Sequence, residues 1–154
     1  MCNFMELGIN RARKTMNENI GGPFGAVIVK DGEIIAVSSN QVLGDKDPTV
    51  HAEITAIRKA CEKLGTHDLS GCEIYATGYP CPMCLGAIIW ANIKTCYYGC
   101  RPADAEKIGF RDDFIYEFIK GGNVNGDVLE LAEFDREKCL ELFKEYAEKE
   151  KEIY

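Results

Sequence analysis

Long hydrophobic runs are missing from this sequence, and so are runs of basic residues. No stretch approaches the roughly 20 apolar residues that a membrane-spanning helix needs, and residues 1–6 lack the basic region and apolar core of a secretory signal. The 25 acidic residues outnumber the 18 basic ones and give a net charge of −7, which repels phosphate backbones. We therefore expect a cytoplasmic protein that binds neither membranes nor nucleic acids.

The sequence also lacks internal repeats, low-complexity tracts and any linker long enough to divide it. Its 154 residues, of which 46% are hydrophobic, suffice for one domain with one core. Eight cysteines are many for this length, but without an export signal a disulfide framework is not expected. We predict a single domain spanning residues 1–154, in which some thiols bind a metal ion and the others pack as small hydrophobic groups.

Hydrophobic periodicity and turn residues predict helices that alternate with strands. Helices are predicted at 5–19, from Thr49 as N-cap to Leu64, from Pro80 to about Ala91 and at 136–150, with shorter pieces at 104–109 and 113–119. Strands are predicted at 24–30, 33–40, 72–77, 94–99 and 127–132. Asp31-Gly32 favours a tight hairpin between the first two strands, so the five-stranded sheet must be mixed. This order predicts an α/β fold in which helices cover a central sheet.

Two short motifs carry metal-binding chemistry. His51 and Glu53 are two residues apart at a predicted helix start, and Cys81 and Cys84 are three apart at another. Zinc prefers imidazole and thiolate ligands in tetrahedral geometry, and a catalytic site uses three protein ligands and leaves one position for water. Positions three apart on a helix share a face, and the positive end of the helix dipole favours thiolates. The sequence therefore predicts one Zn²⁺ per subunit, held by His51, Cys81 and Cys84, with a bound water or hydroxide.

Glu53 is predicted to act on protons rather than on the metal. In the first turn of a helix, side chains tilt toward the N-terminus, so the carboxylate can reach the site without binding the ion. Zinc lowers the pKa of bound water to about 7, and a nearby carboxylate can take that proton and deliver it to a leaving amine. We interpret this arrangement as equipment for hydrolytic deamination, with attack by zinc-bound hydroxide and Glu53 as proton shuttle.

Two other interpretations of the motifs remain open from the residues alone. A structural zinc site needs a fourth ligand, which Cys72, Cys96 or Cys100 could supply; such a site would make the protein a zinc-stabilised binding module without catalysis. A thioredoxin-like redox pair would use the two thiols of the motif but leave His51 and Glu53 without a role. His67 is interpreted as a surface loop residue. The thiols outside the motif are interpreted as packing or surface groups: Cys2, Cys61, Cys72, Cys96, Cys100 and Cys139.

The His-Ala-Glu motif, followed about 30 residues later by Pro-Cys-x-x-Cys, resembles the zinc-dependent nucleobase deaminases of the cytidine deaminase superfamily. Within that superfamily the sequence is most similar to bacterial guanine deaminases, over nearly the whole chain. Four stretches and the chain end carry the resemblance: residues 21–27, 47–59, 81–91, 109–116 and 151–154. The resemblance implies a three-layer α/β/α fold and the conversion of guanine to xanthine and ammonia.

The resemblance also implies five substrate-binding residues. Phe24 and Asn40 would contact the purine, Asp112 would bind its polar edge and Trp90 would form part of the pocket wall. Tyr154 would belong to a C-terminal segment, at about 136–154, that is exchanged between the subunits of a homodimer and closes the partner's site. The chemistry is compatible, because an aromatic ring can stack on a base and an amide can both donate and accept hydrogen bonds.

One position departs from the family pattern. Related guanine deaminases usually carry Glu just before the Pro-Cys motif, and this chain has Tyr79. The departure leaves the zinc chemistry unaffected and concerns the choice of substrate. Alternatives to guanine are another amino-heterocycle, such as cytosine, a cytosine nucleotide or an aminotriazine, and transfer-RNA adenosine, which the net charge disfavours.

Overall fold

The computed structural model describes residues 3–154, so the interpretation of Cys2 lies outside the described residues. The chain forms two compact units, one extending to Asp113 and the other running from Phe114 to Tyr154. The first unit contains every element predicted up to residue 109, together with α2, which lies in a segment predicted as a polar loop. The bounds are α1 (Phe4–Asn17), β1 (Gly25–Lys30), β2 (Glu33–Ser39), α2 (Val42–Asp45), α3 (Ala52–Leu64), β3 (Cys72–Gly78), α4 (Pro82–Trp90), β4 (Thr95–Cys100) and α5 (Pro102–Lys107). The prediction of one domain over the whole chain stays a prediction.

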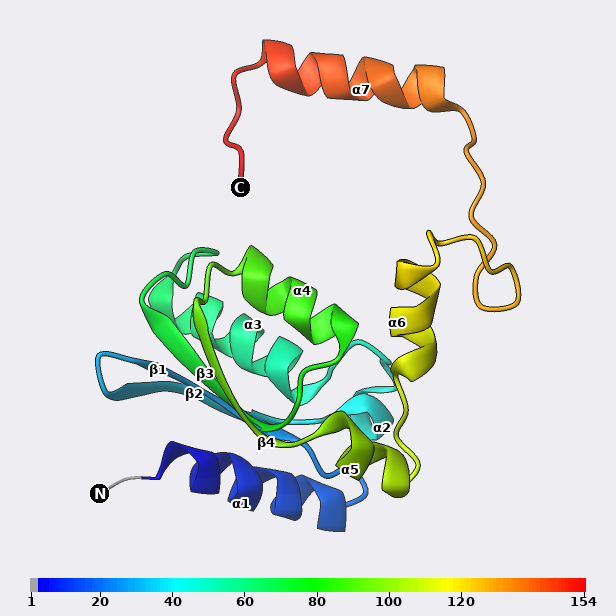
Figure 1. The fold of residues 1–154 in the computed structure, drawn as a ribbon. Helices are drawn as coiled ribbons and strands as arrows, with labels where there is room; N and C mark the ends of the chain where they lie inside the picture. The colour runs from blue at the N-terminus through cyan, green and yellow to red at the C-terminus, as the bar shows by residue number, and fades with distance from the viewer. Residues whose placement is uncertain (1–2) are drawn as a thin grey trace. The chain divides into compact units, whose positions relative to one another are not determined.

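The first unit has the predicted three layers. Its sheet has the order β2-β1-β3-β4, with β1 antiparallel to β2 and β3, and with β3 parallel to β4. Helix α1 covers one face of the sheet, and α3 and α4 cover the other (Figure 1). The mixed α/β/α architecture predicted from the sequence is therefore confirmed.

The topology brings one end of every strand to the same edge of the sheet. Strands β2, β3 and β4 run in the same direction, so their carboxyl ends lie together, and the amino end of the antiparallel β1 joins them. Helix α3 starts after β2, and α4 starts directly after β3. Both helix N-termini therefore meet at this edge, which is where open α/β sheets bind ligands.

Local hydrogen bonds decide where α3 begins and ends. The sequence analysis predicted Thr49 as the N-cap, and this was wrong, because the N-cap is His51. The backbone N–H and the hydroxyl of Thr49 both donate to Asp47 Oδ1, at 2.8 and 2.7 Å, so Thr49 belongs to the preceding turn. The helix ends at Leu64 as predicted, because the next residue, Gly65, adopts the left-handed conformation with φ +66° that favours glycine.

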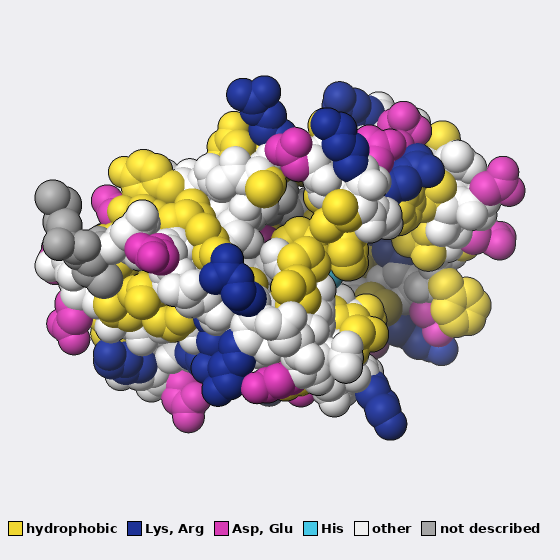
Figure 2. Space-filling view, turned by 90° about the horizontal axis from the view of Figure 1, so that it is seen from below, with side chains coloured by type: hydrophobic (Ala, Val, Ile, Leu, Met, Phe, Trp, Pro, Cys, Tyr) yellow, Lys and Arg dark blue, Asp and Glu magenta, His cyan; other side chains and the backbone are white. Residues whose placement is uncertain are grey.

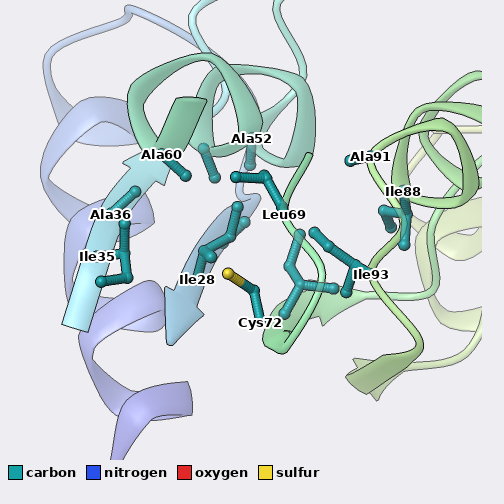
Figure 3. Close-up of a cluster of buried hydrophobic side chains, with 13 residues drawn as sticks. Ile28, Ile35, Ala36, Ala52, Ala60, Leu69, Cys72, Ile88, Ala91 and Ile93 are labelled. Atoms are coloured by element: carbon teal, nitrogen blue, oxygen red, sulfur yellow. The ribbon is translucent and has the colours of Figure 1, made fainter. Parts of the chain in front are cut away.

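The core lies between the sheet and the layer of α3 and α4. Ile28 on β1, Ile74 on β3 and Leu69 are fully buried, and small residues of α3 such as Ala52 and Ala60 allow the helix to approach the strands closely (Figure 3). Each buried Ile or Leu contributes about 1.5–3 kcal/mol. This packing fixes the two helix N-termini relative to the sheet edge.

The second unit contains the end of the chain, and here one prediction was wrong. Helix α6 (Asp113–Lys120) begins at the boundary of the units, and α7 (Arg136–Glu148) agrees with the predicted last helix. Residues 127–132, predicted as a fifth strand, form turn and irregular structure, and Leu129 and Leu131 are exposed. Val128, Leu129 and Leu131 have strand-forming side chains but no neighbouring strand to pair with, and without a hydrogen-bonded ladder no strand forms. The sheet therefore has four strands in the described chain, not five.

The surface shows no segregated basic face in the view from the α1 side. Basic and acidic side chains are interspersed there, with hydrophobic groups between them (Figure 2). Among the described residues, no helix combines the length and the hydropathy that crossing a membrane requires.

Candidate active site

The metal-binding residues occupy the two helix N-termini at the sheet edge. His51 is the N-cap of α3 and Cys81 is the N-cap of α4, both with extended backbone. Pro82 at the first helical position of α4 needs no hydrogen-bond acceptor there, and Cys84 lies one turn further on, fully buried. The sequence prediction that two helix starts present these three side chains to one point agrees with this placement.

The geometry of these side chains fits a zinc ion. His51 Nδ1 lies 3.6 Å from Cys81 Sγ and 3.6 Å from Cys84 Sγ, and the three ligand atoms all lie within 4.8 Å of one another. Tetrahedral coordination with Zn–S and Zn–N bonds of about 2.3 and 2.0 Å separates nitrogen from sulfur by roughly 3.5 Å. Within residues 3–154 the cluster contains no fourth ligand, so Cys72, Cys96 and Cys100 do not close it.

Among the three ligands, Cys81 is the one whose pKa shift favours metal binding, because zinc binds thiolate and neutral imidazole. The hydrogen bond with Cys84, supported by His51, lowers the pKa of the Cys81 thiol, and the same hydrogen bond raises the pKa of Cys84. The hydrogen bond to Cys81 raises the pKa of His51. One thiolate is therefore stabilised before any cation arrives, and thiolate is the form that binds zinc.

Glu53 is the buried carboxylate of the site. It is the second residue of α3, only 7% exposed, and burial is the largest cause that raises its pKa. It lines the same cavity as His51 and Cys81. A carboxylate with a raised pKa accepts a proton more readily near neutral pH, as a proton shuttle must. We call His51, Glu53, Cys81 and Cys84 the metal end.

The cavity beside the metal end has a volume of about 790 Å³. Three residues predicted to bind substrate line it, namely Phe24, Asn40 and Asp112, together with Phe110. The rings of Phe24 and Phe110 meet edge to face with centroids 5.1 Å apart. Burial is the largest cause that raises the pKa of Asp112, followed by the Cys81 charge. We call Phe24, Asn40, Phe110 and Asp112 the base end.

Asn40 is held by backbone groups on one side of its amide. The residue is 6% exposed, and its Oδ1 accepts hydrogen bonds from the N–H groups of Val42 at 3.1 Å and Gly22 at 3.4 Å. The backbone N–H of Asn40 donates to the backbone carbonyl of Phe24 at 2.9 Å. These bonds fix the orientation of the amide, so Nδ2 is the group that remains to donate to a ligand.

The other two predicted substrate residues belong to the end of α4 and to the second unit. Trp90 is 73% exposed at the end of α4 and is not among the residues that line the cavity. Tyr154 is an exposed residue of the second unit. Their assignment to the site stays a prediction.

Sequence reasoning did not assign several residues that line the cavity. Tyr79 was connected with the choice of substrate but not assigned a contact, and Phe110 was noted only as part of a similar stretch. Leu43 belongs to α2, a four-residue helix inside a predicted polar loop, and Arg101 follows β4 directly. The position of Arg101 could have been anticipated, since a residue at the carboxyl end of β4 must lie at the same sheet edge as Tyr79.

Comparison with known proteins agrees with this geometry. Residues 1–100 match the model of the cytidine and deoxycytidylate deaminase zinc-binding region. The chain belongs to this family. It is therefore a homologue of zinc-binding deaminases, and the predicted zinc-dependent hydrolase class is confirmed.

Relatives within this family include enzymes with different substrates. The chain is 53% identical to guanine deaminase of Bacillus subtilis (strain 168) over 116 residues, which are 75% of this chain and 74% of the relative. It is 47% identical to tRNA-specific adenosine deaminase of Agrobacterium fabrum over 98 residues, 64% of each chain. The crystal structure of the Bacillus subtilis guanine deaminase superimposes with a TM-score of 0.90 at 42% identity, covering 98% of this chain and 96% of that one. The fold expected from the resemblance is confirmed.

Proposed function

We propose that this chain hydrolyses guanine to xanthine and ammonia. The observation that carries the proposal is a single cavity that joins the metal end to an aromatic and polar base end. The likeness to guanine deaminase over 98% of the chain supports the same substrate. The reaction adds water across the C=N bond of the amino-bearing ring carbon and then expels the amine. It therefore needs a nucleophile, a proton carrier and a means of orienting the base.

The metal end supplies the first two of these. His51, Cys81 and Cys84 would hold a zinc ion, which would lower the pKa of a water molecule to about 7 and so supply a nucleophile at neutral pH. Glu53 would carry one proton of the attacking water to the ring nitrogen, and would then carry the proton of the hydroxyl formed on the ring carbon to the leaving amine. Its burial keeps the carboxylate away from bulk water, so that the transferred proton stays in the site.

The base end orients the heterocycle. Phe24 offers a face for stacking, and Asn40 Nδ2 donates to an acceptor on the base. Guanine presents O6 and N7 as adjacent acceptors, whereas adenine presents an amino group in place of O6. Asp112 accepts hydrogen bonds from the N–H groups on the opposite edge of guanine. This set of one donor and one acceptor favours guanine over adenine.

We also propose a homodimer in which the segment at about 136–154 is exchanged, so that Tyr154 of one subunit closes the site of the other. Exposed apolar side chains support it: Leu142 and Phe143 on α7 are 63% and 70% exposed, and Ile89 and Trp90 on α4 are 70% and 73% exposed. A second copy would remove such surfaces from water. Light scattering of the full chain and of a chain ending at residue 135 tests this. A dimer that becomes a monomer on truncation supports the exchange, and a monomeric full chain refutes it.

The second candidate substrate is transfer-RNA adenosine, on the strength of the tRNA-specific relative. The net charge of −7 opposes it, because binding RNA requires a basic surface. The cytoplasmic location and the absence of nucleic-acid partners stay predictions.

Ammonia release from zinc-loaded protein tests these choices. The panel contains guanine, adenine, cytosine, adenosine, cytidine, aminotriazines and a transfer-RNA anticodon hairpin. Guanine as the fastest substrate supports the proposal. If guanine releases no ammonia while another heterocycle does, the guanine assignment is refuted. Ammonia release from the hairpin at physiological salt supports the tRNA alternative instead.

A further inference from the structure

Tyr79 lies at the junction between β3 and the metal-binding Cys81. Its backbone N–H donates to the Cys100 carbonyl on the neighbouring strand at 2.9 Å, and the next residue, Pro80, is fully buried. The residue lines the cavity and keeps 40% of its surface exposed. An aromatic residue with a fixed backbone therefore borders the substrate cavity close to the metal end.

The ring of Tyr79 is also restrained by a second ring. It meets Tyr98 of β4 edge to face, with centroids 4.9 Å apart and an interplanar angle of 76°. This is one of the preferred geometries for aromatic pairs, because the positive edge of one ring meets the negative face of the other. The cavity is thus lined by one aromatic pair, Phe24 with Phe110, and by the ring of Tyr79, which Tyr98 restrains from outside the cavity lining.

Neither the metal end nor the proton path uses Tyr79. A large, restrained and partly exposed ring in a binding cavity offers apolar contact area at little cost in conformational entropy. We propose that Tyr79 is a specificity-determining residue that contacts the heterocycle and favours a bicyclic purine over a single six-membered ring. This inference rests on the proposed function, since it concerns selection among amino-heterocycles at the same site.

The physical expectation follows from contact area. Removing an aromatic side chain that stacks on a base costs about 1–3 kcal/mol, and 1.4 kcal/mol corresponds to a factor of ten in affinity. Guanine and isocytosine share the same amino-carbonyl ring, but guanine carries a second ring. Loss of the Tyr79 ring should therefore weaken the binding of guanine more than the binding of isocytosine.

The experiment compares kcat and KM of wild type, Tyr79→Ala, Tyr79→Phe and Tyr97→Ala with guanine and isocytosine, together with zinc content and Tm. Tyr97 is the matched control: it is similarly exposed at 46%, stacks on Tyr75 and is not among the residues that line the cavity. For Tyr79→Ala we expect an approximately tenfold rise in KM for guanine, a guanine-to-isocytosine ratio of kcat/KM at least about threefold lower, and unchanged zinc content. Tyr79→Phe and Tyr97→Ala should stay close to wild type.

Two results overturn the proposal. Unchanged KM and substrate ratio in Tyr79→Ala would show that the ring does not touch the base. An equal loss for both substrates, together with less bound zinc, would show that Tyr79 only supports the backbone beside Cys81. If wild-type protein releases no ammonia from guanine, the guanine assignment fails by itself, and the fastest substrate of the panel replaces guanine in the same comparison.

Discussion

The metal end and the base end of the cavity are built in different ways. The metal end uses four side chains from the first turns of two helices, which the packed core holds at the sheet edge. The base end uses side chains from residues flanking β1 and β2 and from the segment after α5. Zinc coordination permits few substitutions, whereas stacking and single hydrogen bonds can be weakened by degrees. Changes at the metal end should therefore abolish turnover, and changes at the base end should mainly alter KM.

The largest effect is expected from removing a ligand. Cys81→Ser or Cys84→Ala should bind zinc weakly and lose at least about a thousandfold in kcat/KM, because the nucleophile at neutral pH depends on the metal. Zinc content and ammonia release are measured together. Cys139→Ser, which changes an exposed thiol outside the cluster, serves as control and should retain both. Full zinc content in either ligand variant would contradict the assignment of that ligand.

Glu53→Gln should separate metal binding from proton transfer. The amide has nearly the same shape but cannot carry the proton, so kcat should fall by about 10²–10⁴ while zinc stays bound. Glu62→Gln changes an exposed carboxylate on the same helix and should have no effect. Wild-type-like turnover in Glu53→Gln would remove this residue from the mechanism.

At the base end, Asn40→Asp gives a sharper test than truncation to alanine. The aspartate oxygen can still accept from Val42 N–H, but the Nδ2 donor is lost. We expect KM for guanine to rise about tenfold or more, because an acceptor on the base is left without a hydrogen-bond donor. The change in kcat should be much smaller, and the Tm should stay close to wild type. An unchanged KM would mean that the amide does not donate to the substrate.

Two glycines contrast the two ends of the cavity, and the smallest effect of all is expected at the second, Gly86. A Cβ at Gly21 would lie 2.0 Å from the Asn40 carbonyl, so Gly21→Ala should displace Asn40, raise KM and lower the Tm. Gly86 in α4 has no atom within 4 Å of its added Cβ. Gly86→Ala should raise stability by about 0.5–1 kcal/mol through helix propensity and leave kcat and KM unchanged. Thermal unfolding with steady-state kinetics checks both. An unchanged KM and Tm in Gly21→Ala would show that the base end adapts more easily than its packing suggests.

The sequence allowed the metal end to be predicted more fully than the base end, for a physical reason. Zinc requires particular residue types at particular spacings, so His51, Cys81 and Cys84 could be identified without a structure. Aromatic residues that line the cavity, such as Tyr79 and Phe110, carry no spacing signature, because their position in the cavity depends on tertiary structure. The same dependence explains the error at residues 127–132, whose apolar side chains favour a strand although no neighbouring strand pairs with them.

The central claim is that one zinc ion per chain at the His51, Cys81 and Cys84 cluster enables deamination of guanine. The most direct test is to strip the protein with a chelator and titrate zinc back while xanthine and ammonia are measured. Activity should be absent without metal, rise linearly and level off at one zinc per chain, with xanthine and ammonia formed in equal amounts. Full activity in the metal-free protein, or none at one bound zinc per chain, would contradict the account.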